Sequence, residues 1–540
     1  MFRFDRLAII FSLLAVAGSL WISDRVFENL PHIEDEFAYV WQAETFAEAG
    51  ALKLSSPPCP TCFLVPFVID YHGERFGKYP LAWPVVLSFG IRFGARNLVN
   101  PFLAGLGVWL TYRLGKKILG GWVGIIAAFL TLTSPFFLMN SSSLLSHPLS
   151  LDLSLVLAIS WMDTFYPTKK IQDTAQTTKH WNQTKAPSWL TALLSALALG
   201  TLVLTRPLTA VAVGLPFAVH GIYLLWKGSP QTRRLLILVG LVTLLESSLY
   251  FLWQYSLTGN ALMNPYTLWW PNDKIGFGKG IGDSPEGNYL PQILTNIYTS
   301  LRSGASDLFG WGMFSWIFIP FGIWAIRRKR RAWLVGSVFF SLVLVYTLYW
   351  IGSWLFGPRY YYEGIYSLTI LSAAGIAWLA GIPIKIEEGS NTIQQPWIRI
   401  PQLHPPDFAW IRKHYRPILI FGLMVFLTFV SIFYYDPARI GGLEGLYGVS
   451  REHILPFLTP QARTNTPALV IVHTQSSWIE YGTLLDLENP LLTSPFIFMI
   501  DKGPELNQIA INAFPGRKVI DYYTNEPNIF YFPKVTPLQP

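Results

Sequence analysis

The sequence predicts an α-helical protein that spans a membrane about eleven times and ends in a small α/β domain. The composition is the first indication, because 51% of the 540 residues are hydrophobic and 13% are charged, whereas soluble domains carry about a quarter charged residues. The mean hydropathy is +0.36. The second indication is a series of apolar stretches long enough to cross about 30 Å of hydrocarbon. The third is the abundance of aromatic residues, 22 Trp and 25 Tyr, which suit bilayer interfaces.

About eleven apolar stretches account for the predicted spans. They lie at 7–22, 97–114, 120–138, 148–165, 189–205, 208–226, 235–254, 307–326, 333–350, 364–381 and 417–435. The first follows a basic flank and lacks a small-residue cleavage site, so we expect a retained span rather than a signal peptide. A further apolar stretch, "LAWPVVLSFGIRF" (81–93), is short and contains Pro84. We expect this stretch to form a helix that lies in the membrane interface.

Basic residues gather in every second loop between the predicted spans. They are the lysines of 115–117, then Lys169, Lys170, Lys179 and Lys185, the basic residues of 227–234 and 327–331, and finally Arg399, Arg412, Lys413 and Arg416. Because cytoplasmic loops carry the excess of Lys and Arg, this pattern predicts an integral membrane protein with a cytoplasmic N-terminus, which in a bacterium would lie in the cytoplasmic membrane. The net charge of +8 then reflects orientation, and we expect no nucleic-acid partner. The exoplasmic segments are 23–96, 139–147, 255–306, 351–363 and 436–540.

The chain changes character after Asp436. Four stretches are typical of strands, and they are "PALVIVHT" (467–474), "FIFMID" (496–501), "RKVIDYY" (517–523) and "NIFYF" (528–532). Helix-like stretches separate the first three, and such alternation predicts an α/β fold. We therefore expect a transmembrane domain at 1–435, with 23–96 as its first exoplasmic loop, and an exoplasmic α/β domain at 436–540.

An acidic cluster follows the first predicted span, in "PHIEDEFAYVWQAE" (31–44). One acidic residue would suit the start of a helix, but three consecutive carboxylates repel one another. We therefore expect a functional role for Asp35 or Glu36, while Glu34 receives no role. A helix turns by about 100° per residue, so one membrane-proximal face would carry Asp35, Tyr39, Gln42, Phe46 and Gly50, and the opposite, solvated face would carry Glu44 and Glu48.

Two basic residues sit where a lipid phosphate would lie. Lys78 precedes the predicted interfacial helix, and Arg359 lies in "GPRYYYEG" (357–364), between two spans. Arginine suits phosphate because its guanidinium donates two hydrogen bonds at once. By position alone, each is equally an ordinary interfacial anchor.

Three more ionisable residues lie near the outer ends of spans. Asp152 falls about one turn into a predicted span. An ionisable residue there costs free energy and usually has a function. His147 and Arg206 lie at span boundaries, where a capping or structural role explains them equally well.

The two cysteines form the motif "CPTC" (59–62). They are too few for a disulfide framework, and a closed zinc site would need four ligands. A local disulfide between Cys59 and Cys62, a thiol pair, and a metal site that includes His72 all remain open. Apart from that alternative we expect no metal site from the sequence. Whether the activity requires a divalent metal stays open.

Taken together, these stretches resemble the GT-C glycosyltransferases that use polyprenyl-phosphate-linked sugars, such as protein O-mannosyltransferases and lipid A aminoarabinose transferases. "EDEFAYVWQAETFAEAGAL" is similar to the family's DE-x-x-Y…A…G pattern, and "FGKYPLAWP" to its K-P-P-L segment. This chain has "KYPL" in place of "KPPL", so the local turn differs. The resemblance is good over about residues 5–165 and resumes at "GPRYYYEGIYSLTILSAAG".

The resemblance implies roles for individual residues. Asp35 matches the acidic residue that orients or deprotonates the acceptor, and Glu36 is its partner in the DE pair. Lys78 and Arg359 match the residues that hold the donor phosphate. Asp152 falls roughly where the family has a second acidic residue. The remaining candidates for the site are Tyr39, His147 and Tyr360.

The expected function is a cell-envelope glycosyl transfer from a polyprenyl-phosphate sugar to a glycan, lipid or protein acceptor on the exoplasmic face. The reaction would be inverting, with an acidic base, and would need no nucleotide. A transporter or flippase is the main alternative, with Glu246 as its chief mid-span charge. A polysaccharide polymerase or ligase, and a receptor or assembly factor, are further alternatives.

Overall fold

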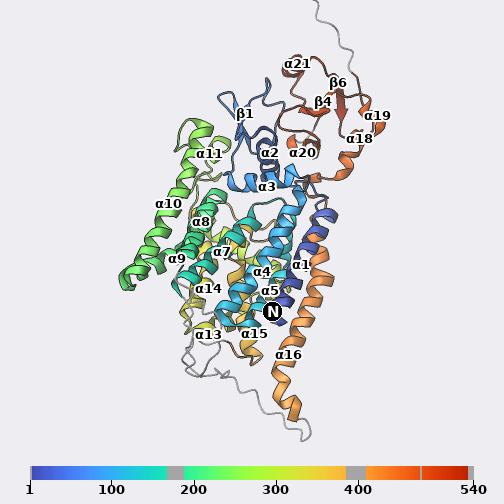
Figure 1. The fold of residues 1–540 in the computed structure, drawn as a ribbon. Coiled ribbons are helices and arrows are strands. Elements are labelled where there is room, and N and C mark those ends of the chain that lie inside the picture. The colour runs from blue at the N-terminus through green and yellow to red at the C-terminus, as the bar shows by residue number, and fades with distance from the viewer. Residues whose placement is uncertain (1–2, 167–187, 385–408, 475–476, 533–540) are drawn as a thin grey trace, which may run out of the picture.

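The computed structural model describes residues 3–166, 188–384, 409–474 and 477–532. Its helices form a long bundle, and two small sheets lie at one end of that bundle (Figure 1). The basic residues Lys169, Lys170, Lys179, Lys185 and Arg399 lie outside the described residues.

Helices of the bundle coincide with the apolar stretches of the sequence. They are α1 (Arg3–Arg25), α4 (Val99–Leu119), α5 (Gly121–Leu132), α6 (Pro135–Ser142), α7 (His147–Phe165), α8 (Trp189–Thr205), α9 (Pro207–Lys227), α10 (Pro230–Thr258), α13 (Ile319–Ile326), α14 (Arg330–Val345), α15 (Ile365–Leu379) and α16 (Ala409–Val430). Helix α15 is buried along almost its whole length. By contrast, α10 lies at the side of the bundle (Figure 1) and leaves Leu244 and Leu245 70% and 73% exposed. Such an apolar outer surface suits contact with lipid.

Fewer spans can be identified by helix length and composition than the sequence predicts. Among the described residues, six helices are long and apolar enough to cross a membrane, or up to eight if each of two bent pairs is one span. Helices α5 and α6 form one pair, bent by 60°, and α12 (Leu290–Asp307) with Gly312–Ile326 forms the other, bent by 102°. The count of eleven spans stays a prediction.

The stretch 307–326, predicted as one span, is not one continuous helix. Helix α12 ends at Asp307, and α13 begins only at Ile319. The chain turns between them at Gly310 and Gly312, whose φ angles are +67° and +57°. Glycine adopts such angles without steric cost, whereas a helix cannot continue through them.

The first outer loop, residues 23–96, is so named because the basic residues predict that it is exoplasmic, and it contains two helices and a small antiparallel sheet. Its elements are α2 (Glu34–Ala49), β1 (Leu54–Ser55), β2 (Val68–Tyr71), β3 (Glu74–Gly77) and α3 (Ala82–Arg92), with strand order β1-β3-β2. The turn from β2 to β3 has positive φ at His72 and Gly73, which suits the twist of a tight hairpin. Lys78 directly follows β3, so the hairpin sets its position. The 11-residue α3, expected in the interface, lies beside α2 at the end of the bundle (Figure 1).

Residues after Asp436 form a parallel sheet with helices between its strands. The strands β4 (Ala468–His473), β5 (Phe496–Ile500) and β6 (Lys518–Tyr523) have the order β5-β4-β6. Helix α20 (Ser477–Gly482) follows β4, and α21 (Pro504–Ala513) follows β5. The stretch 528–532, predicted as a strand, makes a single bridge from Tyr531 to Asp521, so that part of the prediction is wrong.

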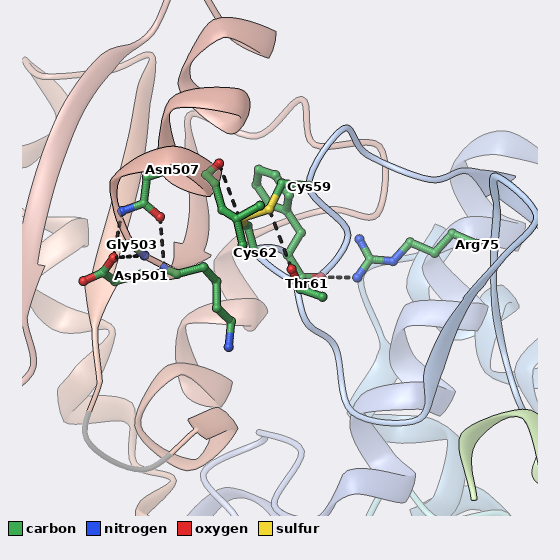
Figure 2. Close-up of a disulfide and its surroundings, with 10 residues drawn as sticks. Cys59, Thr61, Cys62, Arg75, Asp501, Gly503 and Asn507 are labelled. Atoms are coloured by element: carbon green, nitrogen blue, oxygen red, sulfur yellow. Dashed lines mark hydrogen bonds between the residues drawn. A yellow bond between two sulfur atoms is a disulfide. The ribbon is translucent and has the colours of Figure 1, made fainter. Parts of the chain in front are cut away.

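The first outer loop covers one face of this parallel sheet. The structure joins Cys59 and Cys62 by a disulfide, and Cys59, Cys62 and Phe63 share a buried cluster with Leu469 and Ile471 of β4. The carbonyl of Cys62 also accepts a hydrogen bond of 2.8 Å from the N–H of Ile500. Figure 2 shows this disulfide, with Asn507 of α21 drawn on one side of it and Arg75 of the hairpin on the other. The sheet and the loop therefore share a core.

Arg96 forms a second link between the first outer loop and the C-terminal sheet region. Its Nη2 donates to Asp486 Oδ1 at 2.7 Å and to the carbonyl of Asn29 at 2.9 Å. Its Nη1 lies 3.9 Å from Glu44 Oε1. Glu44 was predicted to be solvated, and this prediction is wrong because the opposite face of α2 is covered by residues from far along the chain. Glu48, one turn later, is exposed as expected.

Replacing Arg96 is expected to loosen the C-terminal sheet from the first outer loop. In Arg96→Ala, two partly buried carboxylates lose their cation, at a cost of about 1–3 kcal/mol. Hydrogen exchange of the amides in β4 and α2 should become faster. Arg92→Ala is the matched control, because Arg92 is exposed and lies near by in the sequence. Unchanged exchange in Arg96→Ala would show that the apolar cluster alone holds the two regions together.

Candidate functional site

A cavity of about 250 Å³ opens at the end of the bundle that carries the two small sheets (Figure 1). Segments far apart in sequence converge on it, including α2, the residues after β3, the start of α9, α11 (Pro265–Trp269), η3 (Tyr346–Leu348) and η4 (Arg359–Gly364). Its charged lining residues are Glu34, Asp35, Lys78, Arg206, Asp273 and Arg359. Aromatic rings form much of the remaining wall, from Tyr39, Phe67, Tyr79, Tyr250, Tyr266, Trp270, Tyr346, Tyr349 and Tyr360.

Asp35 lies in the first turn of α2 and points its carboxylate at two partners. The hydroxyl of Tyr79 donates to Asp35 Oδ1 at 2.6 Å, and Arg359 Nη2 lies 3.5 Å from Oδ2. Burial acts to raise the pKa of Asp35, but Arg359 and the Tyr79 hydroxyl outweigh it and hold the pKa below its usual value. Asp35 is therefore a carboxylate at neutral pH.

Arg359 lines the cavity and carries one donor without a hydrogen-bond partner among the described residues. Its Nη1 is buried and has no hydrogen-bond partner within the described part of the chain. The guanidinium also lies 5.7 Å from the ring centre of Tyr360, and Tyr360 stacks on Tyr346 with a centroid distance of 5.2 Å. The contacts with Asp35 and Tyr360 thus hold the guanidinium in place.

Lys78 lies in an aromatic cage. Its Nζ is 3.4 Å from the ring centre of Phe67 and 4.7 Å from that of Trp270, with Tyr266 and Tyr79 at 5.2 and 5.3 Å. Asp273 Oδ2 lies 3.9 Å away. Burial lowers the pKa of Lys78 to about 8, although Asp35, Asp273 and Glu34 act to raise it.

Arg206, which the sequence left without a role, is a third cation of the cavity. Its Nε lies 3.2 Å from Glu363 Oε1, and its Nη2 donates to the hydroxyl of Tyr346 at 3.3 Å. His147 lies behind it, with Nε2 at 3.3 Å from Arg206 Nη1 and Nδ1 at 3.4 Å from Glu363. His147 does not line the cavity, so the structure places it as a support of Arg206.

Glu36 does not line the cavity, contrary to the expected pairing with Asp35. Its carboxylate is buried and accepts the backbone N–H groups of His32 (2.7 Å), Ile33 (3.2 Å) and Leu144 (2.6 Å). Burial raises the pKa of Glu36 to about 7, against these three amides, which favour the charged form. These hydrogen bonds fix the start of α2 against the segment that precedes α7, and a catalytic role for Glu36 stays a prediction.

Glu34 is a cavity residue that the sequence left unexplained. It precedes Asp35 and lines the same cavity. Burial raises its pKa above the usual value for glutamate. The three consecutive acids therefore have different surroundings.

Of the remaining predicted residues, two tyrosines reach the cavity and Asp152 does not. Tyr39 packs on Tyr79 at a centroid distance of 4.4 Å and shares a hydrogen bond of 3.1 Å with Ser146. Asp152 is buried in α7 and has no hydrogen-bond partner among the described residues. Glu246 of α10 accepts from Thr201 at 2.7 Å and does not line the cavity.

Sequence reasoning missed the residues that the loop after α10 contributes. Tyr266, Trp270 and Asp273 come from "PYTLWWPND" (265–273). A dense run of aromatic residues that ends in an acid was the available signal. Across the described residues, no three His, Cys, Asp or Glu side chains are placed to hold a metal ion.

No family model and no curated protein sequence matches the chain. Among solved structures, ArnT from Cupriavidus metallidurans bound to undecaprenyl phosphate aligns with a TM-score of 0.54 at 15% identity, over 95% of this chain and 89% of that one. Its apo state gives a TM-score of 0.53 at 14% identity, over 95% and 88%. The Archaeoglobus fulgidus oligosaccharyltransferase with zinc and sulfate gives 0.50 at 11% identity, over 95% and 67%.

At these identities the similarity establishes the fold. The chain therefore shares the fold of ArnT and of the Archaeoglobus fulgidus oligosaccharyltransferase. The chain is similar to ArnT over nearly its whole length, and the alignment includes the part after Asp436.

Glu36→Gln is expected to destabilise the protein. An amide offers one acceptor oxygen and would turn its NH₂ towards a backbone N–H, which leaves a buried donor unpaired and costs about 1–3 kcal/mol. Thermal unfolding in detergent should show a lower midpoint. Glu48→Gln, on the exposed end of the same helix, should unfold like the wild type. If both variants unfold alike, Glu36 does not hold the start of α2.

Proposed function

We propose that the chain is a membrane glycosyltransferase that moves a sugar from a polyprenyl-phosphate carrier to an acceptor on the exoplasmic face. One observation carries the proposal: Asp35, Lys78 and Arg359 line the same cavity, with Asp35 and Arg359 3.5 Å apart. A base for the acceptor and cations for a phosphate leaving group are thus side by side.

The cations of the cavity suit a phosphate. Lys78 makes no hydrogen bond through Nζ within the described residues, and Arg359 Nη1 is also unpartnered there. Charged donors stabilise negative charge most strongly where water is largely excluded. ArnT, the similar fold, is known in a complex with undecaprenyl phosphate, which supports a polyprenyl phosphate as the carrier.

In the proposed reaction, Asp35 accepts the proton of an acceptor hydroxyl. The hydroxyl oxygen forms a new bond to the anomeric carbon, and the bond from that carbon to the phosphate oxygen breaks. The electron pair leaves with the phosphate, where Lys78 and Arg359 stabilise the charge. Because Asp35 has a lowered pKa, it is in the form that a base requires. A single displacement inverts the anomeric configuration.

The membrane arrangement belongs to the same proposal. We infer about eleven spans, a cytoplasmic N-terminus and an exoplasmic cavity from the basic loops. The region after Asp436 then lies on the exoplasmic side with the first outer loop. The acceptor class, whether glycan, lipid or protein, is left open, as is any metal requirement.

Asp35→Asn is expected to abolish transfer while preserving the fold. Removal of a general base typically costs about 10²–10⁴-fold in rate, and asparagine keeps the shape of the side chain. The measurement is transfer of radiolabelled sugar from polyprenyl-phosphate donors in membranes that contain the wild type or the variant. Glu48→Gln, on the same helix but outside the cavity, should transfer at the wild-type rate. Full activity in Asp35→Asn would remove Asp35 as the base.

Lys78→Ala and Arg359→Ala are each expected to weaken the binding of undecaprenyl phosphate. Loss of a charge-assisted contact should lower affinity about tenfold or more, which corresponds to about 1.4 kcal/mol or more. Binding can be followed by the change in tryptophan fluorescence in lipid nanodiscs, because Trp270 lines the cavity. Arg92→Ala, an exposed arginine at the end of α3, is the control. Equal affinities in all these proteins would contradict a phosphate site in the cavity.

A further inference from the structure

Lys78 has an unusual environment for a lysine. Four aromatic rings surround its ammonium group within 5.3 Å, and its side chain is only 3% exposed. Aromatic faces attract a cation, but they cannot replace the hydrogen bonds that water gives to an ammonium group. A buried ammonium therefore tends to lose its proton unless an acid lies close to it.

Asp273 is the acid closest to this ammonium group. Its side chain is 1% exposed, and its Oδ2 lies 3.9 Å from Lys78 Nζ and has no hydrogen-bond partner in the described part of the chain. Its other oxygen, Oδ1, accepts from the indole N–H of Trp350 at 3.1 Å and from the hydroxyl of Tyr349 at 3.3 Å. One oxygen is thus fixed by the protein while the other faces Lys78.

We propose that Asp273 is a positioning residue that keeps the Lys78 ammonium charged and aimed into the cavity for the donor phosphate. The proposal rests on the proposed function, because it takes Lys78 as a phosphate ligand. Asp273 itself does not touch the phosphate. Its carboxylate affects phosphate binding by holding Lys78. Trp350 and Tyr349 in turn hold Asp273 through their hydrogen bonds to Oδ1.

Other charged groups also face Lys78, and they determine how far the pKa of Lys78 falls when Asp273 is neutralised. Asp35 and Glu34 on α2 act to keep Lys78 protonated, while Arg359 on η4 acts against it. The hydroxyls of Tyr79 and Tyr266 border the same space. Asp35 is itself paired with Arg359, and Asp273 is the acid whose oxygen lies 3.9 Å from Lys78 Nζ.

The test is the pH dependence of undecaprenyl phosphate binding by full-length protein in nanodiscs. In Asp273→Asn the pKa of Lys78 should fall, so the lysine should be neutral under alkaline conditions where the wild type is still partly charged. Affinity relative to the wild type should be within about twofold near pH 6 and lower by about tenfold near pH 8.5, the effect of a shift of about one unit. The lipid's own ionisation is the same for all proteins and cancels in this ratio.

Two further variants separate positioning from folding. Asp273→Glu keeps the charge and should restore alkaline binding. Asp283→Asn, an exposed acid of the same outer loop, should bind like the wild type at both pH values. An equal loss at both pH values in Asp273→Asn would reduce Asp273 to a structural residue and overturn the proposal.

Lys78→Ala distinguishes this proposal from the function on which it rests. If Lys78→Ala weakens binding but Asp273→Asn matches the wild type throughout, the phosphate site stands and the role of Asp273 fails. If Lys78→Ala also binds normally, the assignment of Lys78 to the phosphate fails, and the role of Asp273 fails with it.

Discussion

The cavity depends on the pairing of each buried cation with a carboxylate. An unpaired buried charge costs several kcal/mol. Three cations of the cavity avoid this cost because each has a carboxylate beside it. Arg359 lies 3.5 Å from Asp35, Arg206 lies 3.2 Å from Glu363, and Lys78 lies 3.9 Å from Asp273. In each pair the partners come from segments far apart in the sequence. Each pair is therefore stable only when its two segments meet: the first outer loop with η4, the start of α9 with η4, and the first outer loop with the loop after α10.

Helix α2 organises this end of the molecule because its first turn carries three acids with different surroundings. Successive residues point about 100° apart, so Asp35 faces Arg359 while Glu36 turns inward to three backbone amides. The repulsion expected among consecutive carboxylates is relieved by these separate partners. On the far side of the helix, Glu44 lies beside Arg96, which also binds Asp486. The C-terminal sheet region is therefore coupled to the helix that carries the proposed base.

Features that depend on neighbouring residues were predictable from the sequence. Apolar length located the helices of the bundle, strand-like runs located β4, β5 and β6, and helical phase put Asp35 and Tyr39 on one face of α2. Features that depend on distant packing were not. Glu44 looked solvated because nothing near it in sequence shows that Arg96 will cover it. The stretch 307–326 looked like one span because its hydropathy does not show the turns at Gly310 and Gly312.

The same distinction explains why Lys78, Arg359 and Asp35 were found from the sequence, whereas Asp273 and Glu363 were not. Lys78 and Arg359 belong to short stretches that resemble known motifs, and their positions beside predicted spans indicate a membrane surface. Asp273 and Glu363 need only bring an oxygen within about 4 Å of a cation to act. Many positions in a long loop or at a helix end can satisfy that distance, so no local pattern marks the residue that does. A charge-balanced cavity is thus a property of the folded chain, and the partners of its cations are identified by geometry.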